Sequence, residues 1–110
     1  MNTPTTSGQA PAARAVLALL TEFTDLPAAG IELREALPSQ GVPWMVRVSL
    51  HHDLGGFEQW REALAILPEH VDQHGSGTLA WLKATADYAG IPIEVIAYYD
   101  TDDPDESGPR

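Results

Sequence analysis

The sequence has no cysteine, few basic residues and no long apolar run. Without cysteine the chain cannot form disulfide bonds, thiolate metal sites, iron–sulfur clusters or a cysteine nucleophile. No stretch approaches the roughly 18 apolar residues of a membrane span, and residues 1–16 lack the basic start and apolar run of a signal peptide. We therefore expect a cytoplasmic protein that makes no contact with membranes.

Basic residues are outnumbered: six Lys and Arg stand against 16 Asp and Glu, giving a formal net charge of −10. Nonspecific affinity for nucleic acids depends on basic side chains that displace counterions, so this balance disfavours direct binding to DNA or RNA. An acidic protein can instead mimic a nucleic acid. That alternative predicts carboxylates ranged along one face of the molecule.

The length of 110 residues, 44% of them hydrophobic, fits one small globular domain. Residues 1–10 are rich in Thr, Ser, Gly and Pro and show no periodicity, whereas residues 101–110 are acidic and contain two prolines. Such composition is typical of disordered chain ends. We expect a single domain over residues 11–100 between a disordered N-terminal segment, 1–10, and a disordered acidic tail, 101–110.

Two segments show the apolar spacing of amphipathic helices. The first is "PAARAVLALLTEF", where Pro11 suits a first helical turn and the chain breaks before Pro27. The second is "FEQWREALAIL", with Asp53 as its expected N-cap and Pro68 as its stop. Its expected apolar face consists of Phe57, Trp60, Leu64 and Leu67.

Alternating patterns predict strands in "GIELREAL" and, most clearly, in "WMVRVSLH". The segment 78–100 is ambiguous, because "TLAWLKATADYA" is rich enough in alanine to form a helix. A hairpin that turns at Ala89-Gly90 sets a small residue against a larger one in each pair on one face, which favours two strands. The expected pairs are Ala86/Ile93, Ala84/Val95, Leu82/Ala97 and Ala80/Tyr99.

The resulting order is α-β-β-α-β-β. It predicts an α+β two-layer sandwich, with a four-stranded antiparallel sheet and both helices on one face, in a circularly permuted ferredoxin-like layout. The other face of the sheet is then bare and carries an aromatic pair, Trp81 and Tyr98. A monomer rarely leaves such an apolar group exposed to water. We expect an interaction surface there that includes Met45, Arg47, Trp81, Lys83, Ile96 and Tyr98.

The four histidines raise the alternative of a metal site. In an extended chain "HVDQH" places three possible ligands on one side, and one histidine of "HHD" could join them. Alternating polar residues on an exposed edge explain the pattern equally well. The candidates for this alternative are His51, or His52 in its place, with His70, Asp72 and His74.

Two further patterns have plain structural explanations. Gly55 and Gly56 could expose backbone N–H groups to an anion at a helix start, but glycine also allows a tight turn after a strand. Glu58 and Glu62 lie one helical turn apart, on the expected polar face beside Arg61. Catalytic carboxylates need burial or a cleft, so we expect these side chains to be solvated. No catalytic residue and no cofactor is predicted.

The stretches "DLGGFEQWREAL" and "AGIPIEVIAYY" resemble a loose group of short uncharacterised proteins from high-GC actinobacteria and their mobile elements. The likeness covers residues 12 to 100, and no activity or catalytic residue comes with it. Our leading hypothesis is a non-enzymatic interaction or accessory module that dimerises or binds a partner protein through the open sheet face. A small-ligand or metal-binding protein and a nucleic-acid mimic are the alternatives.

Overall fold

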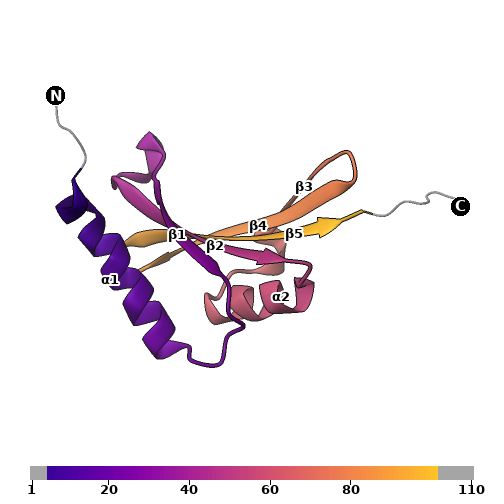
Figure 1. Cartoon of the computed structure of the whole chain (residues 1–110), viewed down its shortest axis with the longest axis horizontal. Helices are drawn as coiled ribbons and strands as arrows, with labels where there is room; N and C mark the ends of the chain where they lie inside the picture. Colours follow the sequence, from indigo (N-terminus) through magenta and orange to yellow (C-terminus); the bar gives the residue numbers. More distant parts are fainter. Residues whose placement is uncertain (1–4, 102–110) are drawn as a thin grey trace, which may run out of the picture.

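The computed structural model describes residues 5–101, which form one five-stranded sheet and two α-helices (Figure 1). Residues 1–4 and 102–110 lie outside this description. The elements are α1 (Thr6–Glu22), β1 (Gly30–Glu35), the 3-10 turn η1 (Pro38–Gln40), β2 (Trp44–His51), α2 (Leu54–Ala63), the 3-10 turn η2 (Pro68–His70), β3 (Asp72–Ser76), β4 (Leu79–Tyr88) and β5 (Ile91–Asp100).

The strand order across the sheet is β1-β2-β5-β4-β3, with β2 and β5 parallel and all other neighbours antiparallel. The expected α+β class and two layers are confirmed, but the expectation of four antiparallel strands in a permuted ferredoxin-like layout is wrong. The extra strand is β3, in a polar stretch that shows no apolar alternation. In the sequence, β3 comes between α2 and the last two strands. This additional strand reverses the expected directions of β4 and β5, so β5 runs parallel to β2.

The terminal hairpin of β4 and β5 is confirmed, together with its register. All four predicted pairs occur, from Ala80 opposite Tyr99 to Ala86 opposite Ile93. Ala89 and Gly90 connect the strands with φ values of 54° and 80°. Two consecutive residues with positive φ form the two-residue turn that matches the twist of paired strands.

Both helices cover the same face of the sheet (Figure 1): α1 packs on β1, β2 and β5, and α2 packs on β2 and β5. The core lies between the layers, and the Trp60 indole N–H donates a hydrogen bond of 2.9 Å to the Pro27 carbonyl. The largest fully buried side chains of the core are Trp60, Phe57, Leu19, Ile93, Val46, Val48 and Val95.

The first helix is longer than the sequence indicates. It begins at Thr6, so Pro11 lies inside it and residues 6–10, expected to be disordered, are helical. Packing explains the extension, because a Cβ on Gly8 would lie 3.8 Å from Trp44 Nε1. The first turns of α1 thus lie beside the Trp44 indole of β2. The expected disorder of residues 1–4 and 102–110 falls outside the described residues.

The second helix ends earlier than expected, at Ala63 rather than near Pro68. Ala65 adopts a left-handed φ of 58°, and the N–H groups of Ala65 and Ile66 bond to the carbonyls of Glu62 and Arg61. This is the Schellman arrangement that satisfies the last carbonyls of a helix. Consequently Leu67, expected on the buried face, is 52% exposed.

Candidate interaction surface

The sheet face opposite the helices is crossed by a row of four aromatic side chains, one from each of four strands. The strand register places His51 of β2 beside Tyr98 of β5, Tyr98 beside Trp81 of β4, and Trp81 beside His74 of β3. Cross-strand neighbours on one face lie close enough for their side chains to contact. We call these four residues the aromatic row.

The rings of the aromatic row contact one another along its length. His51 stacks on Tyr98 with ring centroids 5.2 Å apart, and His74 stacks on Trp81 at 5.7 Å. Trp81 and Tyr98 meet at a tilt of 46° and 6.3 Å. Such pairs are worth about 0.5–1.5 kcal/mol beyond their burial, so each ring holds its neighbour in place. The two central rings are half-buried and the two histidines are exposed.

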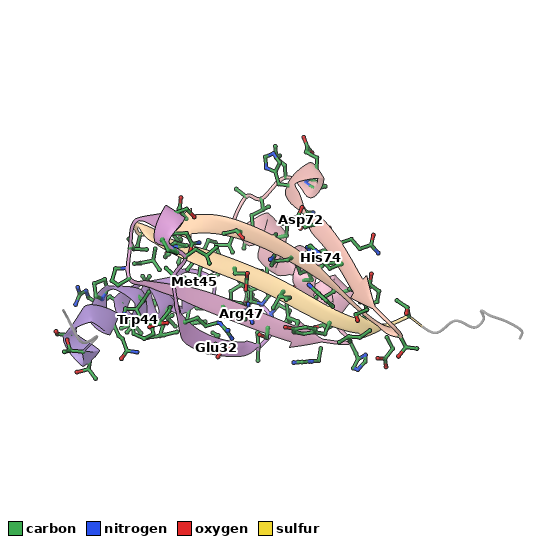
Figure 2. All side chains as sticks on the ribbon, turned by 90° about the horizontal axis from the view of Figure 1, so that it is seen from above. Glu32, Trp44, Met45, Arg47, Asp72 and His74 are labelled. Carbon is green, nitrogen blue, oxygen red and sulfur yellow. The ribbon has the colours of Figure 1, made fainter. Side chains whose placement is uncertain are left out.

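A charged cluster occupies the same face nearer to β1. Arg47 Nε lies 2.5 Å from Glu94 Oε1, and Lys83 Nζ lies 3.9 Å from Glu94 Oε2. The whole Glu94 residue is only 8% exposed, and a carboxylate removed from water in this way requires paired cations. The two cations therefore satisfy a structural charge. Figure 2 shows Arg47 on β2; Glu32 of β1 lies on one side of it, and Glu94 of β5 is its neighbour on the other.

The structure places all six predicted surface residues on the face left bare by the helices, but it does not expose them equally. Met45 and Ile96 are 8% and 4% exposed, because neighbouring side chains on this face cover them. Trp81, Lys83 and Tyr98 remain half-buried. The accessible apolar surface is thus concentrated on the aromatic row.

A hollow of about 330 Å³ lies between the charged cluster and the connection from β1 to β2. Its charged lining balances three cations against two carboxylates, one of which is the paired Glu94. Glu94 is the one buried charged residue in this lining, and it is paired with Arg47 and Lys83. The lining residues are Arg34, Glu35, Leu37, Gln40, Met45, Arg47, Lys83, Thr85 and Glu94.

The histidines predicted as possible metal ligands do not converge. His51 and His74 lie at opposite ends of the aromatic row, separated by Tyr98 and Trp81, and His70 lies in η2. Figure 2 shows Asp72 and His74 together on β3, the outermost strand. Within residues 5–101 no group of three His, Cys, Asp or Glu side chains is placed to hold a metal ion.

The predicted interaction surface includes neither His51 nor His74. His74 was missed because β3 was not predicted, and without β3 nothing places it beside Trp81. The alternation of "WMVRVSLH" predicts His51 on the same face as Met45, and the structure confirms this placement, but the sequence does not show that His51 stacks on Tyr98.

The start of α2 is confirmed as a capped helix. Asp53 Oδ1 accepts a hydrogen bond of 2.8 Å from the Gly56 N–H. A Cβ on Gly56 would lie 2.3 Å from Asp53 Oδ2, whereas one on Gly55 would lie 4.0 Å from the nearest Asp53 oxygen. Gly56 therefore makes room for the capping carboxylate. The Gly56 N–H is thus already bonded within the chain, which favours the structural explanation of the glycine pair.

The expectation that Arg61 lies on a solvated face is wrong. Arg61 is 7% exposed and forks onto Glu58 through Nε and Nη2, at 3.1 and 2.7 Å, while its Nη1 donates to the Ile66 carbonyl at 2.7 Å. The hydrogen bond from Arg61 lowers the pKa of Glu58 below its ordinary value. Arg61 thus fixes the end of α2. The carboxyl groups of Glu58 and Glu62 stay largely exposed.

Five of the described carboxylates do not share the one face on which a nucleic-acid mimic would carry them. Glu58 and Glu62 lie on α2, whereas Glu32 lies on the opposite side of the sheet and Asp53 serves as a cap. Glu94 is neutralised by its two cations.

No protein-family model, curated protein or solved structure matches this chain. Within residues 5–101, neither helix is long and apolar enough to cross a membrane.

Proposed function

We propose that the protein is a non-enzymatic interaction module whose open sheet face binds a partner protein carrying basic side chains. One observation carries this proposal: the aromatic row His51–Tyr98–Trp81–His74 is contiguous, accessible and located on the face that both helices leave bare. Trp and Tyr are the side chains that most often dominate the energy of protein interfaces.

The stacking favours recognition because the rings are already held in one arrangement. Rotamer freedom that is lost on folding need not be lost again when a partner binds, which reduces the entropic cost of association. The strands of the sheet underneath fix the spacing of the rings. A partner therefore binds to a rigid aromatic row rather than to separate mobile side chains.

The negative charge around the aromatic row favours one kind of partner. The chain carries a net charge of −10, and Asp72 and Asp100 lie on the strands that hold the row, two residues from His74 and two from Tyr98, respectively. An acidic surface attracts basic partners and accelerates their encounter. Arg and Lys also bind favourably over the faces of Trp and Tyr rings. A second copy of the chain would bring the same negative charge, so the open face favours a different, basic protein.

The experiment compares neighbouring tyrosines on opposite faces of β5. Tyr98 belongs to the aromatic row, whereas Tyr99 is also half-buried but lies on the helix-facing side, bonded to Gln73. Short unstructured peptides rich in Arg and Ser serve as the probe, with matched peptides in which Glu replaces Arg. Binding is followed by titration calorimetry for every variant.

We expect the Arg peptide to bind and the Glu peptide not to bind. Trp81→Ala and Tyr98→Ala should each weaken the binding tenfold or more, since loss of a central interface aromatic costs about 2 kcal/mol. Tyr99→Ala should leave it unchanged. Equal binding by the two peptides, or an equal loss in Tyr98→Ala and Tyr99→Ala, would contradict the proposal.

A further inference from the structure

Strand β1 forms one edge of the sheet, and its hydrogen-bonding pattern shows which backbone groups face outward. The Ala36 N–H donates to the Pro43 carbonyl at 3.0 Å, in continuation of the β1–β2 register. In an antiparallel pair the residues that bond to the neighbouring strand alternate with those that do not. Arg34, Glu32 and Gly30 therefore bond to β2, and the backbone groups of Ile31, Leu33 and Glu35 point away from the sheet.

An apolar surface lies beside this free edge. Leu17 and Leu20 of α1 are 68% and 43% exposed, although they belong to the apolar stripe of the helix. Leu20 lies near β1, since it lines one hollow together with Ile31, and a second hollow of about 230 Å³ between α1 and β1 is lined by Ala13, Val16, Ile31, Glu32 and Leu33. Exposed leucines beside an unpaired strand edge are a combination that monomeric proteins generally avoid.

We propose that this edge pairs with β1 of a second copy of the chain, antiparallel and around a two-fold axis at Leu33. The axis stands perpendicular to the sheet, so the two sheets become continuous and the helices of both copies lie on the same side. Each copy then presents the same surface to the other, as an isologous interface requires. The exposed leucines of the two α1 helices meet above the joined strands.

Charge selects the register. With the axis at Leu33, Glu32 of each copy lies opposite Arg34 of the other, and the outward backbone groups of Ile31 and Glu35 pair with each other. Moving the axis by one residue in either direction sets two copies of Glu32 or two copies of Arg34 directly opposite each other. Like charges in such positions destabilise a strand pair, whereas opposite charges stabilise it. The short sequence "GIELRE" is thus complementary to itself in one register.

The net charge of −10 opposes the association of two copies at long range. That repulsion is screened beyond about 8 Å at physiological ionic strength, while the strand contacts act at short range. Self-association should therefore strengthen as salt is raised from low to physiological concentration.

The test is a charge swap followed by sedimentation equilibrium. Both Glu32 and Arg34 are exposed, so their substitution leaves the core intact. We expect a concentration-dependent dimer for the wild type. Glu32→Arg and Arg34→Glu should each weaken the association tenfold or more, and the double variant Glu32→Arg/Arg34→Glu should restore it. Thermal melts of the three variants check that the fold is retained.

The Trp81→Ala variant distinguishes a dimer formed through the β1 edge from a dimer formed through the open face. It should leave a dimer formed through β1 unchanged. Several results would overturn the proposal: a wild type that stays monomeric at every concentration, a dimer that persists in both single variants, a double variant that is no better than the singles, or a dimer that Trp81→Ala dissociates. The last result would assign the second copy to the aromatic row. Binding of Arg peptides is a separate readout, so either proposal can fail while the other stands.

Discussion

Replacing Gly56 by alanine should fail to stabilise the protein, although alanine is the better helix former. In an open helical position this exchange gains about 0.5–1 kcal/mol. At Gly56, however, the new Cβ would lie 2.3 Å from Asp53 Oδ2. The carboxylate must move, and the hydrogen bond from the Gly56 N–H is lost. Loss of an N-cap costs about 1 kcal/mol, up to about 2, so the net change should lie between zero and a destabilisation of about 1.5 kcal/mol.

Gly55 supplies the matched control. It occupies the neighbouring position of the same helical turn, but a Cβ there would lie 4.0 Å from Asp53 Oδ1, which is ordinary contact. Gly55→Ala should therefore stabilise the protein by about 0.5–1 kcal/mol. In a domain of this size, 1 kcal/mol corresponds to a shift in the melting temperature of about 4–8 °C.

A double-mutant cycle isolates the steric cause. Once Asp53→Ala has removed the carboxylate, Gly56→Ala should become stabilising by about 0.5–1 kcal/mol, as at an unobstructed position. Thermal and urea unfolding followed by circular dichroism provide the free energies. The reasoning is refuted if Gly56→Ala stabilises the wild type as much as Gly55→Ala does, or if its effect is the same with and without Asp53.

Two further substitutions test the ion pair on α2 and the terminal turn. The lowered pKa of Glu58 implies stability that is present above the ordinary glutamate pKa of about 4.3 and is lost as the pH falls through the lowered value. Glu58→Gln should thus be less stable than the wild type at pH 7, with a difference that shrinks in acid; an unchanged difference across a pH series of urea melts would contradict this. Ala89→Gly should stabilise the hairpin by about 1 kcal/mol, because alanine at a φ of 54° is strained; a lower melting temperature would count against it.

The terminal hairpin could be predicted because its signal is local. The pairing of small with large residues, such as Ala84 with Val95, requires knowledge of only 23 consecutive residues. The Asp53 cap was predictable for the same reason, since donor and acceptor lie three residues apart.

Strand β3 and the parallel pairing could not be predicted from patterns of this kind. The sequence "DQHGS" is polar on both sides, and each of its residues is exposed, so no apolar alternation marks it as a strand. It forms because β4 supplies a template at its free edge, which is a tertiary effect. Missing this one strand reversed the expected direction of the last two and hid His74, one of the four residues of the aromatic row.

The burial of Arg61 was missed for a related reason. Its position in the helical pattern indicates the polar face, yet the Schellman turn brings the Ile66 carbonyl back over that face. A guanidinium that bonds a carbonyl beyond the end of its own helix leaves no periodic signal.

The position of β5 affects how the molecule can assemble. It is the last strand along the sequence, yet it lies in the middle of the sheet, between β2 and β4. Each residue of β2 that pairs with β5 has its partner 47 residues further along the chain, and such distant pairings slow folding. A ribosome would therefore synthesise most of the chain before β5 could pair with the backbone edge of β2, and a chain that ends before Ile91 would contain the pairs β1–β2 and β3–β4 without the central strand that joins them.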